Sequence, residues 1–110
     1  MSNSDMSSTV LIVDDDSSIR WVLARALNNA QFKVLSCDSG QQAISIIESN
    51  PPQLVITDIQ MNGMDGLELL ATINHKWPEL PVIMITAYAD TDLATKTHEL
   101  GAFDYLPKPF

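Results

Sequence analysis

Acidic, hydroxyl and amino side chains follow four separate apolar segments of this 110-residue chain. The side chains belong to Asp14, Asp15, Asp16, Asp58, Thr86 and Lys108, and the apolar segments span residues 10–13, 54–57, 82–85 and 105–106. Short apolar segments of this kind are typical of buried β-strands. In a parallel sheet the carboxyl ends of the strands gather along one edge, where open α/β sheets bind ligands. We therefore expect carboxylates, a hydroxyl and an ammonium group to converge in a phosphoryl-transfer site.

The acidic residues are suited to binding a metal ion. Carboxylates that lie close together repel one another unless a cation sits between them, and hard oxygen ligands suit Mg²⁺. A simpler interpretation is that Asp14, Asp15 and Asp16 only cap the helix that follows them. Because Asp58 ends a neighbouring strand, the metal site is favoured over helix capping.

Asp58 has a second role open to it. Its carboxylate could ligate the metal or act as a nucleophile that forms an acyl phosphate; for a lone strand-end aspartate the alternative is a turn cap. Gly63 and Gly66 follow within eight residues and would let the backbone approach a ligand closely. Lys108 lies between prolines that fix the local backbone, which favours a defined position over a solvated surface lysine. Thr86 could instead be an ordinary β-branched strand residue.

Strand and helix patterns alternate from end to end, which predicts βαβ units around a parallel sheet. The second strand is predicted at Lys33–Cys37 and the fifth at Ala102–Leu106. The first helix is predicted to bury a one-sided apolar stripe, made of Ile19, Val22, Leu23, Ala26 and Leu27. Segment 90–100 has few large apolar residues, so we expect a weakly packed, mobile helix there, with Gly101 just beyond its end.

Helix starts are marked by capping signals. Asp16 or Ser17 is placed to cap the first helix. Ser39 followed by Gln42 forms a capping box for the second helix, and residues 65–68 contain the start signal of the third.

Composition narrows the possible functions. Six basic and fourteen acidic residues give a net charge of −8, which disfavours direct binding to DNA or to anionic membranes. We expect neither a membrane span nor a signal peptide, and residues 1–9 are predicted to be a disordered tail. Cys37 is the single cysteine, so we expect a buried thiol in a reducing, cytoplasmic compartment. His75 and His98 are expected on exposed helix faces without a role.

Five motifs together resemble the receiver family of two-component response regulators. They are Leu11-Ile12-Val13-Asp14-Asp15-Asp16, Thr57-Asp58-Ile59, Met64-Asp65-Gly66, Ile85-Thr86-Ala87 and Lys108-Pro109-Phe110. The resemblance covers residues 10–110, and the motifs occur in the order that the family has. Segments 14–21 and 101–108 resemble the NtrC-type activators of nitrogen regulation most closely.

The resemblance implies a flavodoxin-like fold, which is a doubly wound, five-stranded parallel sheet with strand order 2-1-3-4-5. Residues 10–110 would form this receiver domain and would stop before the family's fifth helix. Without that helix, we expect one face of the sheet to be poorly covered. Asn62 departs from the proline that the family often has in the loop after the acceptor.

The resemblance also implies roles at the acidic edge. Asp58 would be the phosphoacceptor for a sensor histidine kinase. Mg²⁺ would be held by Asp14, Asp15, Asp58 and the backbone carbonyl of Gln60, and Asp16 would be the supernumerary acid. The chain would be a switch rather than an enzyme, because it would catalyse only its own phosphorylation and dephosphorylation.

Four further groups would respond to the phosphoryl group. Lys108 and the backbone N–H of Ala87 would bind its oxygens, and Thr86 and Tyr105 would form the conformational switch. In NtrC-type proteins the output is carried by an attached ATPase domain and a separate DNA-binding domain, and phosphorylation would favour a dimer.

Two other functions remain open. A Mg²⁺-dependent phosphohydrolase of the haloacid-dehalogenase type would also form an aspartyl phosphate, but it would place a second aspartate where this chain has Gln60. A receiver-like binding module that is never phosphorylated is disfavoured by the intact Asp58, Thr86 and Lys108.

Overall fold

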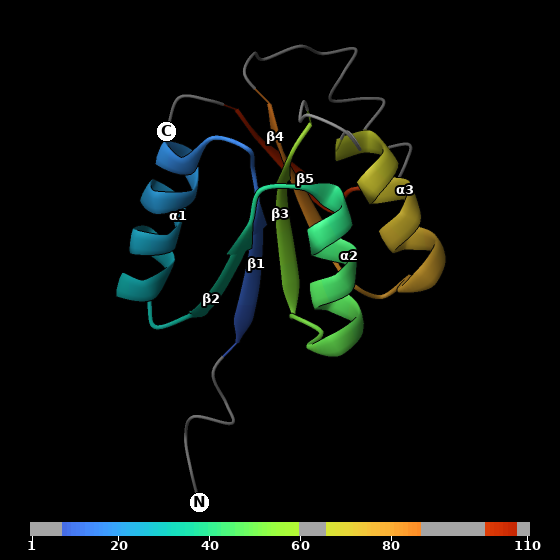
Figure 1. The fold of residues 1–110 in the computed structure, drawn as a ribbon, viewed down its shortest axis with the longest axis horizontal. Helices are drawn as coiled ribbons and strands as arrows, with labels where there is room; N and C mark the ends of the chain where they lie inside the picture. The colour runs from blue at the N-terminus through green and yellow to red at the C-terminus, as the bar shows by residue number, and fades with distance from the viewer. Residues whose placement is uncertain (1–7, 60–65, 87–100, 108–110) are drawn as a thin grey trace, which may run out of the picture.

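A computed structural model of the chain describes residues 8–59, 66–86 and 101–107, and for residues 86 and 105–107 it describes the backbone alone (Figure 1). The described residues form five strands and three helices. Their bounds are β1 Thr9–Val13, α1 Ser17–Asn29, β2 Lys33–Cys37, α2 Gly40–Ser49, β3 Leu54–Asp58, α3 Gly66–Lys76, β4 Val82–Thr86 and β5 Asp104–Pro107.

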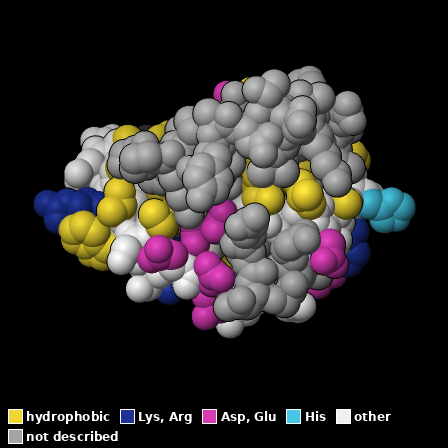
Figure 2. Space-filling view, turned by 90° about the horizontal axis from the view of Figure 1, so that it is seen from above, with side chains coloured by type: hydrophobic (Ala, Val, Ile, Leu, Met, Phe, Trp, Pro, Cys, Tyr) yellow, Lys and Arg dark blue, Asp and Glu magenta, His cyan; other side chains and the backbone are white. Residues whose placement is uncertain are grey.

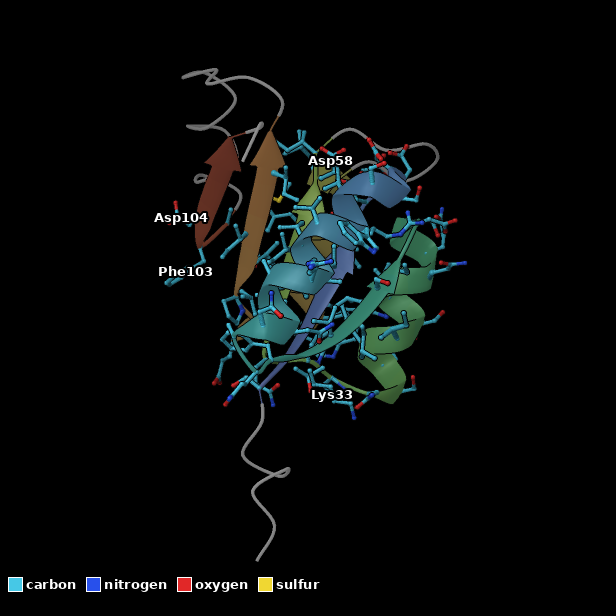
Figure 3. The ribbon with its side chains drawn as sticks, turned by 90° about the vertical axis from the view of Figure 1, so that its left-hand side faces the viewer. Lys33, Asp58, Phe103 and Asp104 are labelled. Carbon is cyan, nitrogen blue, oxygen red and sulfur yellow. The ribbon has the colours of Figure 1, made fainter. Side chains whose placement is uncertain are left out.

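The strands form one parallel sheet, as the sequence pattern predicted, and their order β2-β1-β3-β4-β5 is the one that the family resemblance implied. β2 has the predicted bounds, and β1 begins at Thr9, which was assigned to the tail. β5 starts two residues later than predicted, because its ladder with β4 begins where Ile83 pairs with Asp104. Phe103, just before it, is 71% exposed, and Figure 3 shows both residues at the start of this edge strand.

The inner strand β1 is covered on both faces, which explains why its residues Val10 to Val13 are all apolar. Val10 and Ile12 pack on one face with Leu23 of α1, whereas Leu11 and Val13 pack on the other face with residues of α2 and α3. These four side chains are at most 1% exposed. Strands buried on both sides read as continuous apolar segments rather than alternating ones.

The helices divide unequally between the faces. Of the three described helices, α1 lies on one side of the sheet, and α2 and α3 lie together on the other (Figure 1). Right-handed crossovers require this division, because the chain moves outward from β1 to β2 and then returns across β1 to β3. The winding direction therefore reverses between β1 and β3.

Side chains cap two helices as the sequence predicted, with one difference. The Asp16 carboxylate accepts a hydrogen bond from the Ser18 N–H at 2.8 Å and caps α1. The Ser39 hydroxyl accepts from the Gln42 N–H at 3.2 Å and caps α2. The Gln42 side chain accepts from the Asp38 N–H at 3.3 Å rather than from Ser39, so the box closes one residue earlier.

The predicted apolar stripe of α1 is only partly buried. Leu23 is buried, and Ile19 and Leu27 are half-buried against the sheet. Val22 is 41% exposed and Ala26 is also exposed, so the expectation that they face the core was wrong. The face of α1 that contacts the sheet runs from Ile19 through Leu23 and Leu27 to Ala24. At about 100° per residue this face spans roughly 140°, and Val22 and Ala26 lie beyond its Ile19 edge.

Several expectations concern residues that lie outside the described part of the structure. These are the tail over residues 1–7, the start signal at Asp65, the mobile helix at 90–100 and the position of His98. Among the described residues, His75 is exposed as predicted, and Gly101 has a φ of 100° that suits glycine beyond a helix end. No described helix has the length and apolar character to cross a membrane.

Cys37 is buried at the end of β2, as predicted. Burial raises the pKa of its thiol from 9.0 to about 11, and the neighbouring Asp38 carboxylate acts in the same direction. The folded protein therefore favours the neutral thiol. This preference stabilises the fold at pH values below 9, and the contribution is lost as the pH rises towards 11.

We predict that Cys37 reacts slowly with iodoacetamide. A pKa two units higher lowers the thiolate fraction near neutral pH about 100-fold, so alkylation at about pH 8 should be at least that much slower than in the unfolded chain. Mass spectrometry of samples with and without denaturant measures the ratio. The free energy of unfolding should also fall more steeply between pH 9 and 11 than in Cys37→Ala; parallel curves would contradict the raised pKa.

Candidate functional site

Two adjacent strands carry acidic residues to the same edge of the sheet. Asp14 directly follows β1, and Asp58 is the last residue of β3. Val13 pairs with Thr57 in the parallel register, so the next residue on each strand is an aspartate. Figure 3 shows Asp58 at the upper end of β3, at the end of the sheet opposite to Lys33. The strand register itself therefore brings two carboxylates together.

Asp15 completes a cluster of three acids. Carboxylate oxygens of Asp14, Asp15 and Asp58 all lie within 4.8 Å of one another. Asp14 is fully buried and Asp58 is 8% exposed, whereas Asp15 is exposed. Figure 2, which views the molecule from this end, shows acidic side chains gathered near the centre of the face. The acidic cluster is thus buried on the side of the strands and reachable from solvent at Asp15.

The acidic cluster fits a hard divalent cation. Two unit charges about 5 Å apart repel by roughly 3 kcal/mol at an effective dielectric constant near 20. A cation among the three carboxylates converts this repulsion into attraction. Carboxylate oxygens are hard ligands, and a site that opens to solvent leaves positions for the waters that Mg²⁺ retains. The donor chemistry of the three acids therefore suits Mg²⁺.

Asp16 has a different position from its two acidic neighbours. Its carboxylate caps α1, and its N–H donates to Oδ1 of Asp14 at 2.9 Å. The acidic cluster consequently contains the first two aspartates of the triplet and Asp58, but not the third. The capping interpretation, raised for all three aspartates, describes the contacts of Asp16.

The backbone of Asp58 is held from several directions. The Thr57 hydroxyl donates to the Asp58 carbonyl oxygen at 3.1 Å, and the Ile59 N–H donates to the Ile85 carbonyl oxygen at 3.1 Å. The Gly66 N–H donates to the Ile59 carbonyl oxygen at 2.7 Å. A Cβ at Gly66 would lie 1.9 Å from the Asp58 carbonyl oxygen, so no other residue fits there without a backbone shift.

This contact changes the interpretation of the glycine. The sequence suggested that Gly66 lets the backbone approach a ligand. The structure adds a second reason for glycine, because Gly66 lies against the backbone of the strand end that carries Asp58. Its small size brings the start of α3 into contact with that strand end.

The other predicted site residues are only partly described. Thr86 ends β4 and Tyr105 lies in the adjacent strand β5, so their backbones are on the side of β3 away from β1. The side chains of these two residues lie outside the described part of the structure. So do the whole residues Gln60, Gly63, Ala87 and Lys108.

Arg20 is a neighbour of the acidic cluster that the sequence analysis missed. Its Nη1 donates a hydrogen bond to the backbone carbonyl oxygen of Asp14. Arg20 lies four residues after the N-cap Asp16, and helical side chains tilt towards the N-terminus of their helix. That spacing, one turn into a helix that starts at an acidic site, is the signal that could have identified it.

Comparison with known proteins identifies the family. The sequence model of the response regulator receiver domain family matches residues 10–110 of this chain. The chain is 50% identical over 99 residues to the DNA-binding transcriptional regulator NtrC of Klebsiella pneumoniae, which covers 90% of this chain and 21% of that protein. It thus spans about a fifth of the length of that relative. It is 35% identical over 105 residues to sporulation initiation phosphotransferase F of Bacillus subtilis, covering 96% of this chain and 85% of that protein.

Solved structures agree with this assignment. The receiver domain of NtrX from Brucella abortus has a TM-score of 0.88 at 35% identity, covering 92% of this chain and 86% of that one. A putative response regulator from Chloroflexus aurantiacus has a TM-score of 0.90 at 36% identity, covering 94% and 87%. The fold, the acidic strand ends and these similarities lead to one conclusion: the chain belongs to the response regulator receiver domain family of two-component signalling.

Proposed function

We propose that Asp58 is the phosphoacceptor of an NtrC-type regulator and that Mg²⁺ assists the transfer. The observation that carries this proposal is the cluster of carboxylate oxygens from Asp14, Asp15 and Asp58 within 4.8 Å. Asp58 is the only acid of the cluster that ends a strand of the sheet. Its backbone is also fixed by neighbouring strands and by Gly66, as a nucleophile with a defined line of attack requires.

The transfer itself is a single displacement. A carboxylate oxygen of Asp58 forms a bond to phosphorus as the bond from phosphorus to the donor breaks, and the donor keeps the electron pair of that bond. For a sensor kinase the bond that breaks is the N–P bond of a phosphohistidine. Bound Mg²⁺ would offset negative charge on the phosphoryl oxygens. Asp14, Asp15 and the carbonyl of Gln60 would hold the metal with Asp58.

Residues at the other strand ends would sense the product. Lys108 would pair with the phosphoryl oxygens, and the N–H of Ala87 would donate to them. Thr86 would then hydrogen-bond the phosphoryl group and change the packing of Tyr105. The backbones of Thr86 and Tyr105 lie on adjacent strands, which suits a coupled movement of the two side chains.

The output would pass to other domains of a longer protein. The relatives named NtrC are DNA-binding transcriptional regulators of about five times this length, so we assign this chain to the regulation of transcription in nitrogen metabolism. A cytoplasmic sensor kinase domain would be the phosphodonor, and phosphorylation would favour a dimer.

DNA binding would belong to a separate domain, because the net charge of −8 disfavours contact with the phosphate backbone. Residues 10–110 would be the receiver domain, and a fifth helix after them would cover the sheet beside α1.

Phosphorylation by a small donor tests the proposed acceptor. With acetyl phosphate and Mg²⁺, the wild-type chain should gain one phosphoryl mass, and Asp58→Asn should gain none. Intact mass spectrometry measures the gain. Asp38→Asn is a matched control, because Asp38 directly follows β2, the other neighbour of β1, and lies outside the acidic cluster. Equal labelling of Asp58→Asn and wild type, or continuous turnover of p-nitrophenyl phosphate, would contradict the proposal.

Neighbouring aspartates should differ in their effect on Mg²⁺. Asp15→Asn removes a carboxylate from the acidic cluster and should weaken binding about tenfold or more. Asp16→Asn removes the same charge one residue later but keeps a good N-cap residue, and should change the affinity about twofold at most. Magnesium titrations followed by amide NMR shifts give both dissociation constants. Equal losses of Mg²⁺ affinity in the two variants would contradict the assignment of Asp14 and Asp15, rather than Asp15 and Asp16, as metal ligands.

Gly66→Ala should disturb the acceptor more than its effect on stability explains. The added Cβ must displace the backbone at Asp58, which should cost about 1–3 kcal/mol and slow labelling by acetyl phosphate. Leu69→Ala, at a buried position of the same helix, should cost about 2–5 kcal/mol and is the control. Labelling rates are compared at temperatures where both variants are fully folded. Equal rates in the two variants would remove Gly66 from the site.

A further inference from the structure

Arg20 uses its guanidinium in an unexpected way. Although three carboxylates lie at the same end of the sheet, its Nη1 donates to the neutral backbone carbonyl of Asp14. The side chain is half-buried on α1. A half-buried arginine that donates to backbone loses side-chain entropy and hydration, so its contact with this carbonyl calls for an explanation.

The hydrogen bond completes the fixation of the peptide unit that joins the two metal acids. The Asp14 N–H donates to the Cys37 carbonyl oxygen on β2 at 3.2 Å, and one oxygen of its carboxylate accepts from the Asp16 N–H at 2.9 Å. Arg20 holds the remaining polar group of the Asp14 backbone, its carbonyl. That carbonyl belongs to the peptide between Asp14 and Asp15, so its direction sets where the Asp15 side chain begins.

Asp15 lies just beyond the paired residues of β1. Of the three acids it is the exposed one, and it lies after the last residue of β1, so no strand pairing fixes it. Arg20 is also tied to this turn through its own backbone, because its N–H donates to the Asp16 carbonyl oxygen at 3.2 Å. Arg20 is therefore attached to the turn that carries the acids both by its side chain and by its backbone N–H.

We propose that Arg20 is a positioning residue for the metal site: by holding the Asp14 carbonyl it fixes the peptide that aims Asp15 at the cation. The inference rests on the proposed Mg²⁺ site. It assigns to α1, which supplies no metal ligand, a part in setting the affinity of the acidic cluster. Groups that fix ligands typically change metal affinity about 10-fold or more when removed.

Charge and positioning make opposite predictions for this residue. A guanidinium near a cation site opposes cation binding, so loss of its charge alone would strengthen Mg²⁺ binding. Loss of the hydrogen bond frees the Asp14–Asp15 peptide and would weaken binding. The sign of the change in affinity therefore distinguishes a positioning residue from a nearby positive charge.

The test compares Mg²⁺ dissociation constants of four folded proteins. Arg20→Met should bind Mg²⁺ about 5- to 10-fold more weakly than wild type, and Arg20→Lys, which keeps a donor and the charge, should stay within about threefold. Arg25→Met is the matched control, because Arg25 lies on the same helix above the Trp21 ring at 5.3 Å, about 14 Å along the helix axis from the cap residue Asp16. The Mg²⁺ affinity of Arg25→Met should equal that of the wild type or be slightly higher.

A second readout reports the positioning directly. Amide hydrogen exchange at Asp15 and Asp16, measured without metal, should be faster in Arg20→Met than in wild type and Arg25→Met. If Arg20→Met does not fold, Arg20→Gln carries the same comparison. Equal or tighter Mg²⁺ binding by the neutral variant would overturn the inference, as would equal losses in Arg20→Met and Arg20→Lys. Failure of the wild type to bind Mg²⁺ would instead overturn the proposed metal site.

Discussion

The parallel register between β1 and β3 is the constraint on which the rest of this structure depends. It pairs Val13 with Thr57, so the aspartates that follow emerge side by side. The winding direction of the sheet reverses between the same two strands, with α1 on one face and α2 on the other. Ligand crevices of open α/β sheets form at such a reversal, because the connections leave in opposite directions. The register and the topology thus select the same place for a site.

This placement has an electrostatic cost that the core must offset. Each pair of carboxylates in the acidic cluster repels by roughly 3 kcal/mol in the absence of a cation. Burial of one large aliphatic side chain contributes about 1.5–3 kcal/mol, and the four buried residues of β1, Val10 to Val13, outweigh a repelling pair. A strand apolar on both faces is therefore what allows the sheet to present acids at its end. Burial of β1 on both faces is therefore a condition for placing the acids at its end.

The sequence predicted the sheet well for the same reason. Strands buried on both sides give uninterrupted apolar segments, and the predicted bounds of β2 were confirmed. Periodicity was less reliable for α1, where Val22 and Ala26 fit the helical stripe but are exposed, because a pattern does not reveal how the helix is rotated about its axis on the sheet. Gly66 was noticed for a different reason, and Arg20 was missed. Both contact backbone carbonyl oxygens, Arg20 that of Asp14 and Gly66 that of Asp58, and residue types do not display contacts with backbone atoms.

The proposed acceptor, Asp58, is firmly held and almost fully buried, and this combination bears on how a phosphodonor would act. Asp58 is 8% exposed, and its carbonyl is contacted by Thr57 and Gly66, so neither its side chain nor its backbone is free to move out to a donor. If Asp58 is the acceptor, the phosphoryl group would therefore have to come to the carboxylate, carried either on a side chain of the donor protein or on a small molecule. Because both kinds of donor meet the same fixed carboxylate, the geometry for transfer belongs to this domain. A protein donor adds recognition of the surrounding surface and raises the local concentration of the phosphoryl group.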